Sequence, residues 1–249
     1  WRDWSSDVCS SDLWVESAIL LCFLFLIFAC TFLILYNGHV SQRDVFLSSE
    51  GDAWYFRNKS RLGENLWEID VLSKYVKKSD SNRILEVGCS SGIKLATLIS
   101  QMGGEGYGID PSSEAIIDAQ KNYTDSRLNF ARGTVDQLDF ESNFFDLIFV
   151  AFCFYLVDRN LLPRAVSELD RCLKKGGMVA IADFDPGREY DLPYSHFPGI
   201  STFKRNYGNP FLELGYHLAA KESFDHARKE VGFSYEENDR VSIQLLVKP

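Results

Sequence analysis

A turn of small residues follows an apolar run near the middle of the chain and has the composition of a ligand-binding loop. Residues 83–87 predict a strand, and the apolar positions from Ile93 onward predict a helix. Between these elements, Gly88 and Gly92 carry no side chain. The backbone can therefore approach a ligand closely and present the amides of the helix start to it.

A carboxylate closes the next predicted strand. Tyr107 and Ile109 are apolar positions of that strand, and Asp110 stands at its end. Because the carboxyl ends of neighbouring parallel strands lie at one edge of a sheet, Asp110 is expected beside the glycine turn. A carboxylate there can accept hydrogen bonds from two ribose hydroxyls. The turn and the carboxylate together predict a nucleoside site.

These residues resemble the first motifs of the class I S-adenosylmethionine (SAM) dependent methyltransferases, in which the turn reads acidic-x-Gly-x-Gly-x-Gly. Glu86, Gly88 and Gly92 match, and Ser90 stands where the family has its middle glycine. Segments that match later motifs follow in the family's order at 133–138, 145–150 and 173–181. The resemblance implies an enzyme that uses SAM as its cofactor and transfers the activated methyl group.

The same resemblance implies which residues contact SAM. They lie in the glycine turn, at the ends of the second and fourth strands and after the third strand: Glu86, Gly88, Cys89, Gly92, Asp110, Pro111, Ser112, Asp136 and Ala151. The turn residues face the methionine portion, and Asp110 faces the ribose. Asp136 is expected near the adenine, although the family often has an acidic residue where this chain has Thr134. A helix cap is the alternative role for Asp136.

Two side chains are candidates for chemistry at the methyl acceptor. Tyr155 follows the fourth predicted strand, where this fold places residues beside the methyl group. His196 lies in an aromatic segment after the fifth strand, and histidine can accept a proton near neutral pH. The alternatives are a buried aromatic helix start around Phe154 and a solvated loop histidine.

Composition limits the possible partners. The chain has 249 residues, 46% of them hydrophobic, and a formal net charge of -9. An acidic protein lacks the basic surface that holds phosphate backbones, so no nucleic-acid partner is expected. The six cysteines form no Cys-x-x-Cys pair, which favours reduced thiols in a cytoplasmic domain without a structural metal.

Alternation of predicted strands and helices sets the fold class. Strands are predicted at 83–87, 106–110, 128–132, 145–151 and 178–184, and helices at 93–101, 113–122 and 161–172. This pattern predicts an α/β fold, a doubly wound Rossmann-like sheet within a three-layer sandwich. Two partly alternating segments, 216–224 and 240–248, match the family's final hairpin. They complete a seven-stranded sheet that is parallel except for one antiparallel strand near the C-terminus.

The N-terminal part divides by composition. Residues 3–13 (DWSSDVCSSDL) resemble a translated sequencing adapter, so 1–13 are treated as an artefact. Within 14–40, the uncharged run 18–36 is long enough for a transmembrane helix, unless the segment is not translated. Residues 41–82 are predicted to form a helical cap, and 83–249 the methyltransferase domain, with an aromatic cap insertion at 185–214. The alternative localisation is a single-pass membrane anchor with a cytoplasmic catalytic domain.

The leading hypothesis is methyl transfer from SAM to a small-molecule acceptor, such as a sugar or another hydroxylated metabolite. The alternative is a non-catalytic SAM-binding or membrane-associated partner protein, which the departures at Ser90 and Thr134 would suit. An NAD-dependent enzyme is disfavoured, because the dinucleotide motif needs a glycine where Ile93 stands. The sequence leaves the acceptor atom and the oligomeric state open.

Overall fold

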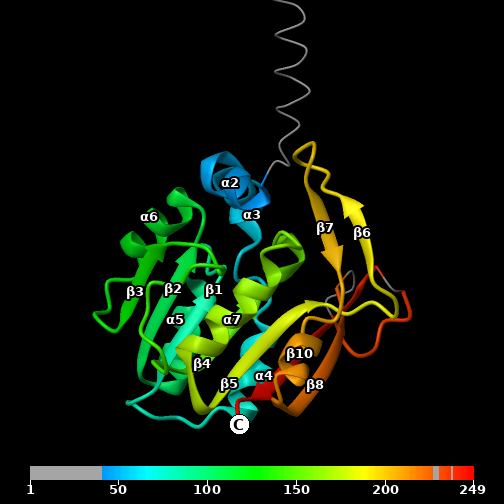
Figure 1. Cartoon of the computed structure of the whole chain (residues 1–249). Helices are drawn as coiled ribbons and strands as arrows, with labels where there is room; N and C mark the ends of the chain where they lie inside the picture. Colours follow the sequence, from blue (N-terminus) through cyan, green and yellow to red (C-terminus); the bar gives the residue numbers. More distant parts are fainter. Residues whose placement is uncertain (1–40, 227–229, 237) are drawn as a thin grey trace, which may run out of the picture. The chain divides into compact units, whose positions relative to one another are not determined.

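A computed structural model of the chain describes residues 41–226, 230–236 and 238–249 (Figure 1). Within them, a mixed eight-stranded sheet has the order β3-β2-β1-β4-β5-β10-β8-β9. The first five strands in this order are parallel to one another, and β10 runs antiparallel to both of its neighbours. The expectations for residues 1–13 and 14–40, including the run 18–36, lie outside the described residues.

The parallel strands and their helices alternate as predicted. The strands are β1 (Arg83–Val87), β2 (Glu105–Asp110), β3 (Leu128–Arg132), β4 (Phe145–Ala151) and β5 (Leu173–Phe184). The helices between and before them are α4 (Trp67–Tyr75), α5 (Ile93–Met102), α6 (Ser113–Asn122) and α7 (Leu162–Cys172). The doubly wound Rossmann-like prediction is therefore confirmed, with β8 (His217–Asp225) and β10 (Arg240–Val247) as the final pair.

Alternating side chains of each central strand supply two separate cores. Ile84 and Leu147 pack on one face with α4, α5 and α6, whereas Leu85 and Ile148 pack on the other face with α7. A short helix, α8 (Asn209–Glu213), adds Phe211 to this second core. Strands buried on both faces read as continuous apolar runs, so their limits were readable from the sequence.

The C-terminal half differs from the sequence expectations in three places. β5 begins at Leu173 rather than at residue 178, because Leu173 pairs with Phe145 ahead of an irregularity in the ladder. Within the aromatic cap insertion expected at 185–214, β6 (Tyr190–Pro193) and β7 (Ser201–Lys204) form an antiparallel hairpin, which was not predicted. A two-residue strand, β9 (Glu230–Val231), adds an eighth strand beside β8.

An N-terminal helical segment lies over the carboxyl ends of the parallel strands. It comprises α2 (Gln42–Val45), a π-helical turn (Phe46–Glu50), α3 (Gly51–Asn58) and a 3₁₀ turn (Lys59–Arg61). Figure 1 shows α2 and α3 in blue at this end of the sheet, with the β6–β7 hairpin rising at the same end. No helix among the described residues has both the length and the apolar character needed to cross a bilayer.

Buried polar contacts fasten this helical segment to the hairpin. Glu50, which is 3% exposed, accepts a hydrogen bond from the Tyr194 hydroxyl at 2.7 Å and pairs with Arg57. Val45 of α2 packs with Tyr194 and Ile200 in a small apolar cluster. The two segments therefore form one cover over this end of the sheet.

Candidate active site

The glycine turn after β1 adopts a left-handed backbone. Gly88 and Gly92 have φ angles of +74° and +78°, and a Cβ atom on Gly92 would lie 2.5 Å from the Phe130 ring. Ser90, at the family's middle glycine position, has φ +48°, a region that residues with a side chain seldom occupy. Ser90 thus keeps the glycine conformation without being a glycine.

Asp110 holds the turn from the neighbouring strand. Its carboxylate accepts hydrogen bonds from the backbone N–H groups of Ser90 at 2.9 Å and Ser112 at 2.8 Å. Burial raises the pKa of Asp110 to about 6, and the two backbone N–H groups oppose that shift. Ser112 also caps α6 through its hydroxyl. The sequence-predicted pairing of turn and carboxylate is therefore present in the fold.

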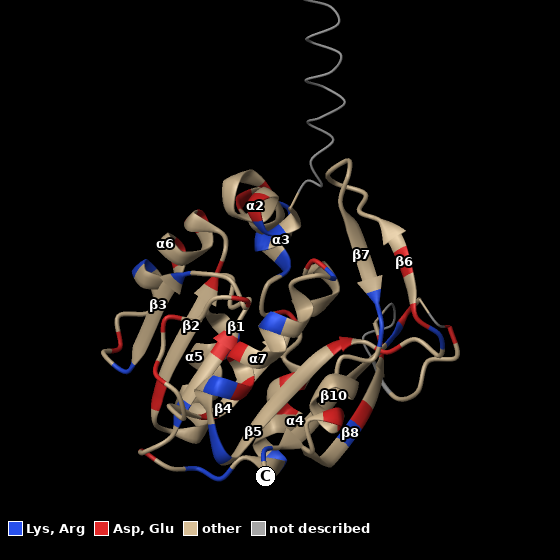
Figure 2. Ribbon diagram, in the orientation of Figure 1, with Lys and Arg blue, Asp and Glu red and all other residues tan. Residues whose placement is uncertain are grey.

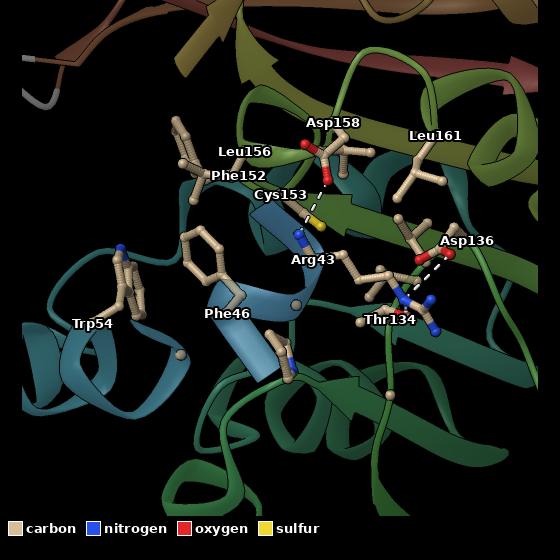
Figure 3. Close-up of a pocket in the computed structure, with 17 residues that line it drawn as sticks. Arg43, Phe46, Trp54, Thr134, Asp136, Phe152, Cys153, Leu156, Asp158 and Leu161 are labelled. Carbon is tan, nitrogen blue, oxygen red and sulfur yellow. Dashed lines mark hydrogen bonds and ion pairs between the residues drawn. The ribbon is translucent and has the colours of Figure 1, made fainter. Parts of the chain in front are cut away.

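A pocket with about 790 Å³ of empty space, part of it open to solvent, lies between the helical cover and the strand ends (Figure 3). We call it the Asp136 pocket. Its floor and walls come from the turn after β1, the loop after β3 and the segment after β4, and its cover comes from α2 and α3. Its lining includes Phe46, Trp54, Gly88, Pro111, Gly133, Val135, Asp136, Phe152, Cys153 and Leu161.

Arg43 of α2 closes one side of the Asp136 pocket. Its guanidinium forms an ion pair with Asp136 at 3.4 Å, and its Nε donates a hydrogen bond to the Thr134 hydroxyl at 3.3 Å. Its backbone N–H donates to Asp158, as Figure 3 shows. The loop after β3 is thus held from the N-terminal cover. Asp136 caps no helix in the described residues but pairs with an arginine.

A second, larger pocket adjoins the first. We call it the Glu86 pocket. It has about 1760 Å³ of empty space, part of it open to solvent, and it shares Trp54, Gly88 and Phe152 with the Asp136 pocket. Aromatic rings make much of its wall: Trp54, Trp67, Phe152, Tyr155, Phe184 and Phe224. The two pockets therefore meet over the glycine turn.

Buried polar atoms without hydrogen-bond partners show whether this region suits a SAM-type cofactor. Glu86 is 1% exposed, and its Oε2 has no hydrogen-bond partner among the described residues. The buried Ser90 hydroxyl is likewise without a partner there. Buried polar atoms are normally paired, so both await a polar ligand. The glycines on one side and the unpaired carboxylate oxygen on the other suit a nucleoside that carries an ammonium group.

Phe152 and Tyr155 follow β4 at the junction of the two pockets. Phe152 has φ +51° and packs edge-to-face on Phe184, and strained backbone of this kind gathers at functional sites. Tyr155 lines the Glu86 pocket, as the sequence predicts for an acceptor-facing residue. Burial, followed by the charge of Asp183, raises the pKa of Tyr155 well above its usual value. Its hydroxyl is therefore a hydrogen-bond donor at neutral pH.

The predicted site residues separate into three groups. Those that line one pocket or both are Glu86, Gly88, Cys89, Pro111, Asp136, Ala151 and Tyr155. Gly92, Asp110 and Ser112 form the turn and its support. His196 lines neither pocket; it is exposed and lies edge-on to the Tyr194 ring at 5.4 Å. The hairpin buries Tyr194 against Phe46, and this packing leaves His196 outside.

Sequence reasoning missed several pocket residues. Arg43, Glu68, Lys94 and His226 all line a pocket. Glu68 had a signal: it precedes the buried Val71 and Leu72 by three and four residues, so it stands on the buried face of α4. Arg43, Lys94 and His226 had no such signal in the sequence, because their positions depend on contacts between distant segments. The described residues contain no cluster suited to a metal ion.

Fold and site together define a Rossmann-like domain for a nucleoside cofactor, and comparisons with known proteins narrow the class. Residues 84–177 match a family described as "Methyltransferase domain". A putative methyltransferase of Haloferax volcanii, solved in complex with the Trm112 methyltransferase activator, superposes with a TM-score of 0.63 at 21% identity. That alignment covers 84% of this chain and 98% of the other.

Two curated relatives are also methyltransferases. A 2-phytyl-1,4-naphtoquinone methyltransferase of Nostoc punctiforme is 28% identical over 66% of this chain and 70% of its own length. A sterol 24-C-methyltransferase of Kluyveromyces lactis is 26% identical over 64% of this chain, but only 43% of its own length is covered. Residues 84–177 therefore match a methyltransferase domain, and the chain has the Rossmann-like fold of SAM-dependent methyltransferases to which it is similar.

Proposed function

We propose that this chain transfers the methyl group of SAM to a hydroxylated, largely apolar small molecule that binds in the Glu86 pocket. One observation carries the proposal: the Glu86 pocket is walled by aromatic rings and meets the Asp136 pocket at Phe152. Small-molecule pockets commonly measure about 300–1,000 Å³. The Glu86 pocket has a cavity volume of about 590 Å³, which lies within this range.

Ring contacts around this pocket favour an apolar acceptor. Trp67 lies against Phe224 with ring centroids 3.5 Å apart, and Tyr155 contacts Phe184 at 5.2 Å. Such surfaces bind fused rings or isoprenoid chains through buried apolar area. The curated relatives are named for a naphtoquinone and a sterol, which supports the same class. Within the hydroxylated metabolites expected from the sequence, we therefore favour apolar ring compounds over sugars.

We propose complementary roles for the residues of the two pockets. Bound SAM supplies an activated methyl group. Asp110 holds the ribose, and the Asp136 pocket holds the adenine. Tyr155 donates a hydrogen bond that orients the acceptor hydroxyl behind the methyl group, and such alignment accounts for much of an enzyme's acceleration.

The acceptor proton needs a base, and the described wall of the Glu86 pocket contains one histidine. His226 lines this pocket, with its ring 5.3 Å from that of Phe152. We propose that His226 takes the hydroxyl proton as the oxygen–carbon bond forms and the carbon–sulfur bond breaks. This role replaces the one predicted for His196.

Methyl transfer from isotope-labelled SAM to a panel of acceptors tests this function. The panel contains hydroquinones and hydroxylated sterols, with hydrophilic sugars for comparison. We expect labelled product from an apolar acceptor, with the rate reduced about 10- to 100-fold by Tyr155→Phe or His226→Asn. His196→Asn is the matched control and should leave the rate unchanged. Label on the sugars alone, or SAM binding without transfer to any acceptor, would contradict the proposal.

A further inference from the structure

Two aromatic residues in the wall of the Glu86 pocket are held at their backbone by one buried carboxylate. Tyr155 belongs to the 3₁₀ turn after β4 (Phe154–Leu156), and Phe184 is the last residue of β5. Asp183, which is 3% exposed, accepts hydrogen bonds from the N–H of Phe184 at 2.8 Å and from the N–H of Tyr155 at 3.3 Å. Asp183 therefore fixes the backbone of both residues, whose rings contact each other edge to face.

A buried lysine from the β6–β7 hairpin covers the rings of the same two residues. Lys204 is the last residue of β7 and is 9% exposed. Its ammonium lies over the Phe184 ring and 5.1 Å from the centroid of the Tyr155 ring. An aromatic face attracts a cation in this position. Lys204 and Asp183 thus hold the same two residues, one through their rings and the other through their backbone.

The surroundings of the Lys204 ammonium are unusual for a buried lysine. Among the residues that the structure describes, no carboxylate lies within ion-pair distance of this ammonium, and no oxygen accepts a hydrogen bond from it. Buried lysines are normally paired, and an ammonium has three donors to satisfy. The neighbouring Arg205 shows the contrast, because it pairs with both Glu189 and Asp191. A lysine that only fastened the hairpin to the sheet would need such a partner, so the ring contacts of Lys204 need another explanation.

The charge of Lys204 depends on its buried surroundings. Burial lowers the pKa of Lys204 to about 7, and the carboxylates of Asp183 and Asp239 oppose this shift. Burial also raises the pKa of Asp183 to about 7, against the two backbone N–H groups and Lys204. The other titratable groups whose charges couple to Asp183 are Tyr155, Tyr207 and Cys153. Lys204 therefore carries its charge in mildly acid solution and loses it as the pH rises above neutrality.

We propose that Lys204 is a positioning residue for the methyl acceptor: its ammonium holds the Tyr155 ring so that the Tyr155 hydroxyl meets the hydroxyl of an apolar acceptor in the Glu86 pocket. Lys204 lines neither pocket, so it acts through Tyr155. The β6–β7 hairpin thereby takes part in the choice of acceptor. The inference rests on the proposed function, because that function assigns Tyr155 to the acceptor hydroxyl.

Two probes that differ by one hydroxyl group test this role. 1-Naphthol and naphthalene are titrated at pH 6 into the full chain saturated with S-adenosylhomocysteine. We expect the wild type to bind 1-naphthol about 5- to 10-fold more tightly, the usual effect of one hydrogen bond. Tyr155→Phe should abolish this preference, and Lys204→Met should abolish most of it because the Tyr155 ring is no longer held. Naphthalene affinity should stay unchanged in both variants, which also shows that they are folded.

Lys221→Met is the matched control, because Lys221 pairs with Asp185 at 2.8 Å and contacts neither ring. It should keep the preference for 1-naphthol. A purely structural role of Lys204 predicts instead that Lys204→Met loses affinity for both probes equally. That result, or a Lys204→Met variant with the full preference, would overturn the inference.

The charge of Lys204 supplies a second test. The wild-type preference for 1-naphthol should decrease between pH 6 and pH 8, because Lys204 loses its proton in this range. Lys204→Arg should keep the preference at both pH values, because arginine stays charged, and the other groups of the pocket are the same in both proteins. An equal decrease in wild type and Lys204→Arg would overturn the inference. A wild type that binds neither probe, or binds both equally, would instead refute the proposed function itself.

Discussion

The carboxylate of Asp158 accepts a hydrogen bond of 3.1 Å from the backbone N–H of Arg43, 115 residues earlier in the chain. Its other oxygen accepts from the N–H of Gln42, also at 3.1 Å. Asp158 is 5% exposed and acts as a helix cap supplied from a distant segment. It sets the position of α2, and thereby the position of Arg43 over Asp136.

Removal of this cap should loosen the cover of the Asp136 pocket. We expect Asp158→Ala to lower the free energy of unfolding by about 1–2 kcal/mol, the usual cost of losing a helix cap. It should also weaken binding of S-adenosylhomocysteine and 5′-methylthioadenosine alike, because the nucleoside side is affected. Urea unfolding and calorimetry measure both effects, with the exposed Asp139→Asn as control. Weaker binding of only one of the two ligands would contradict this account.

Substitution of Ser90 by glycine should stabilise the protein. The φ of +48° at Ser90 costs a serine more than a glycine, so Ser90→Gly is expected to raise the free energy of unfolding by a few tenths to about 1 kcal/mol. Gly92→Ala should act in the opposite direction, because its methyl group would meet the Phe130 ring. Thermal unfolding of both variants checks the two signs. A destabilised Ser90→Gly variant would show that the serine hydroxyl has a structural role.

Cofactor binding should depend on pH through Glu86. Without ligand its pKa is about 8, so near pH 7 the carboxyl is mostly protonated, and binding an ammonium there requires loss of that proton. Affinity for S-adenosylhomocysteine should therefore rise as the pH increases from 6 to about 8. Titrations in buffers of different ionisation enthalpy should detect proton release near pH 7. Glu86→Gln should abolish that release, and a wild type that takes up protons would contradict the assignment.

The raised pKa of Glu86 should also make the stability of the ligand-free protein depend on pH. Glu86 has a pKa of about 8 in the folded protein and an ordinary value of 4.5 in the unfolded chain, so the folded state holds the extra proton between these values. Its contribution to stability is complete below pH 4.5 and is lost as the pH rises through 8. Denaturant midpoints measured across this range should therefore fall less in Glu86→Gln than in wild type.

An ion pair on α7 should stabilise the loop that carries Asp136. Glu168 accepts a hydrogen bond from the backbone N–H of Leu138, and Arg171 donates to the carbonyl oxygens of Leu138 and Phe140. The Arg171 hydrogen bond lowers the pKa of Glu168 to about 2. Its contribution is therefore complete above pH 4.5 and is lost as the pH falls through 2.

We expect Glu168→Gln to lower the free energy of unfolding by about 1–2 kcal/mol at neutral pH, since a partly buried charged hydrogen bond is weakened. The difference in the free energy of unfolding between Glu168→Gln and wild type should become smaller in acid. Urea denaturation at two pH values measures this change. Glu213→Gln, on the exposed side of α8, is the control. A difference that stays constant with pH would exclude the charge as its cause.

Local patterns in the sequence determined the parallel sheet and the glycine turn. The buried strands β1 and β4 are largely apolar, and the turn depends on residues that are adjacent in the chain. These two strands and the more exposed β3 were predicted with their observed limits. Tyr155 lies four residues after the end of β4, so its location near this strand end follows from the local sequence. These features need no knowledge of distant contacts.

The cover and the choice of histidine could not be predicted in this way. Arg43 reaches the site because Asp158 positions α2, and this pairing has no local signature. His196 and His226 each lie two residues after an aromatic side chain and both are exposed. Only the packing of the β6–β7 hairpin and of β8 places His226 at a pocket wall and His196 away from it. The antiparallel strands of the C-terminal half were therefore the main reason why the site residues could not all be predicted.

The contacts of Gln42 bear on the order in which the protein folds. Its side chain donates to the Leu156 carbonyl and accepts from the Ser201 N–H, across separations of 114 and 159 residues. During synthesis the segment that contains Gln42 leaves the ribosome long before these partners exist. Contacts of such high sequence separation form late and slow folding. The cover should therefore dock last, onto a sheet that is already assembled, and its release should be the first step of unfolding.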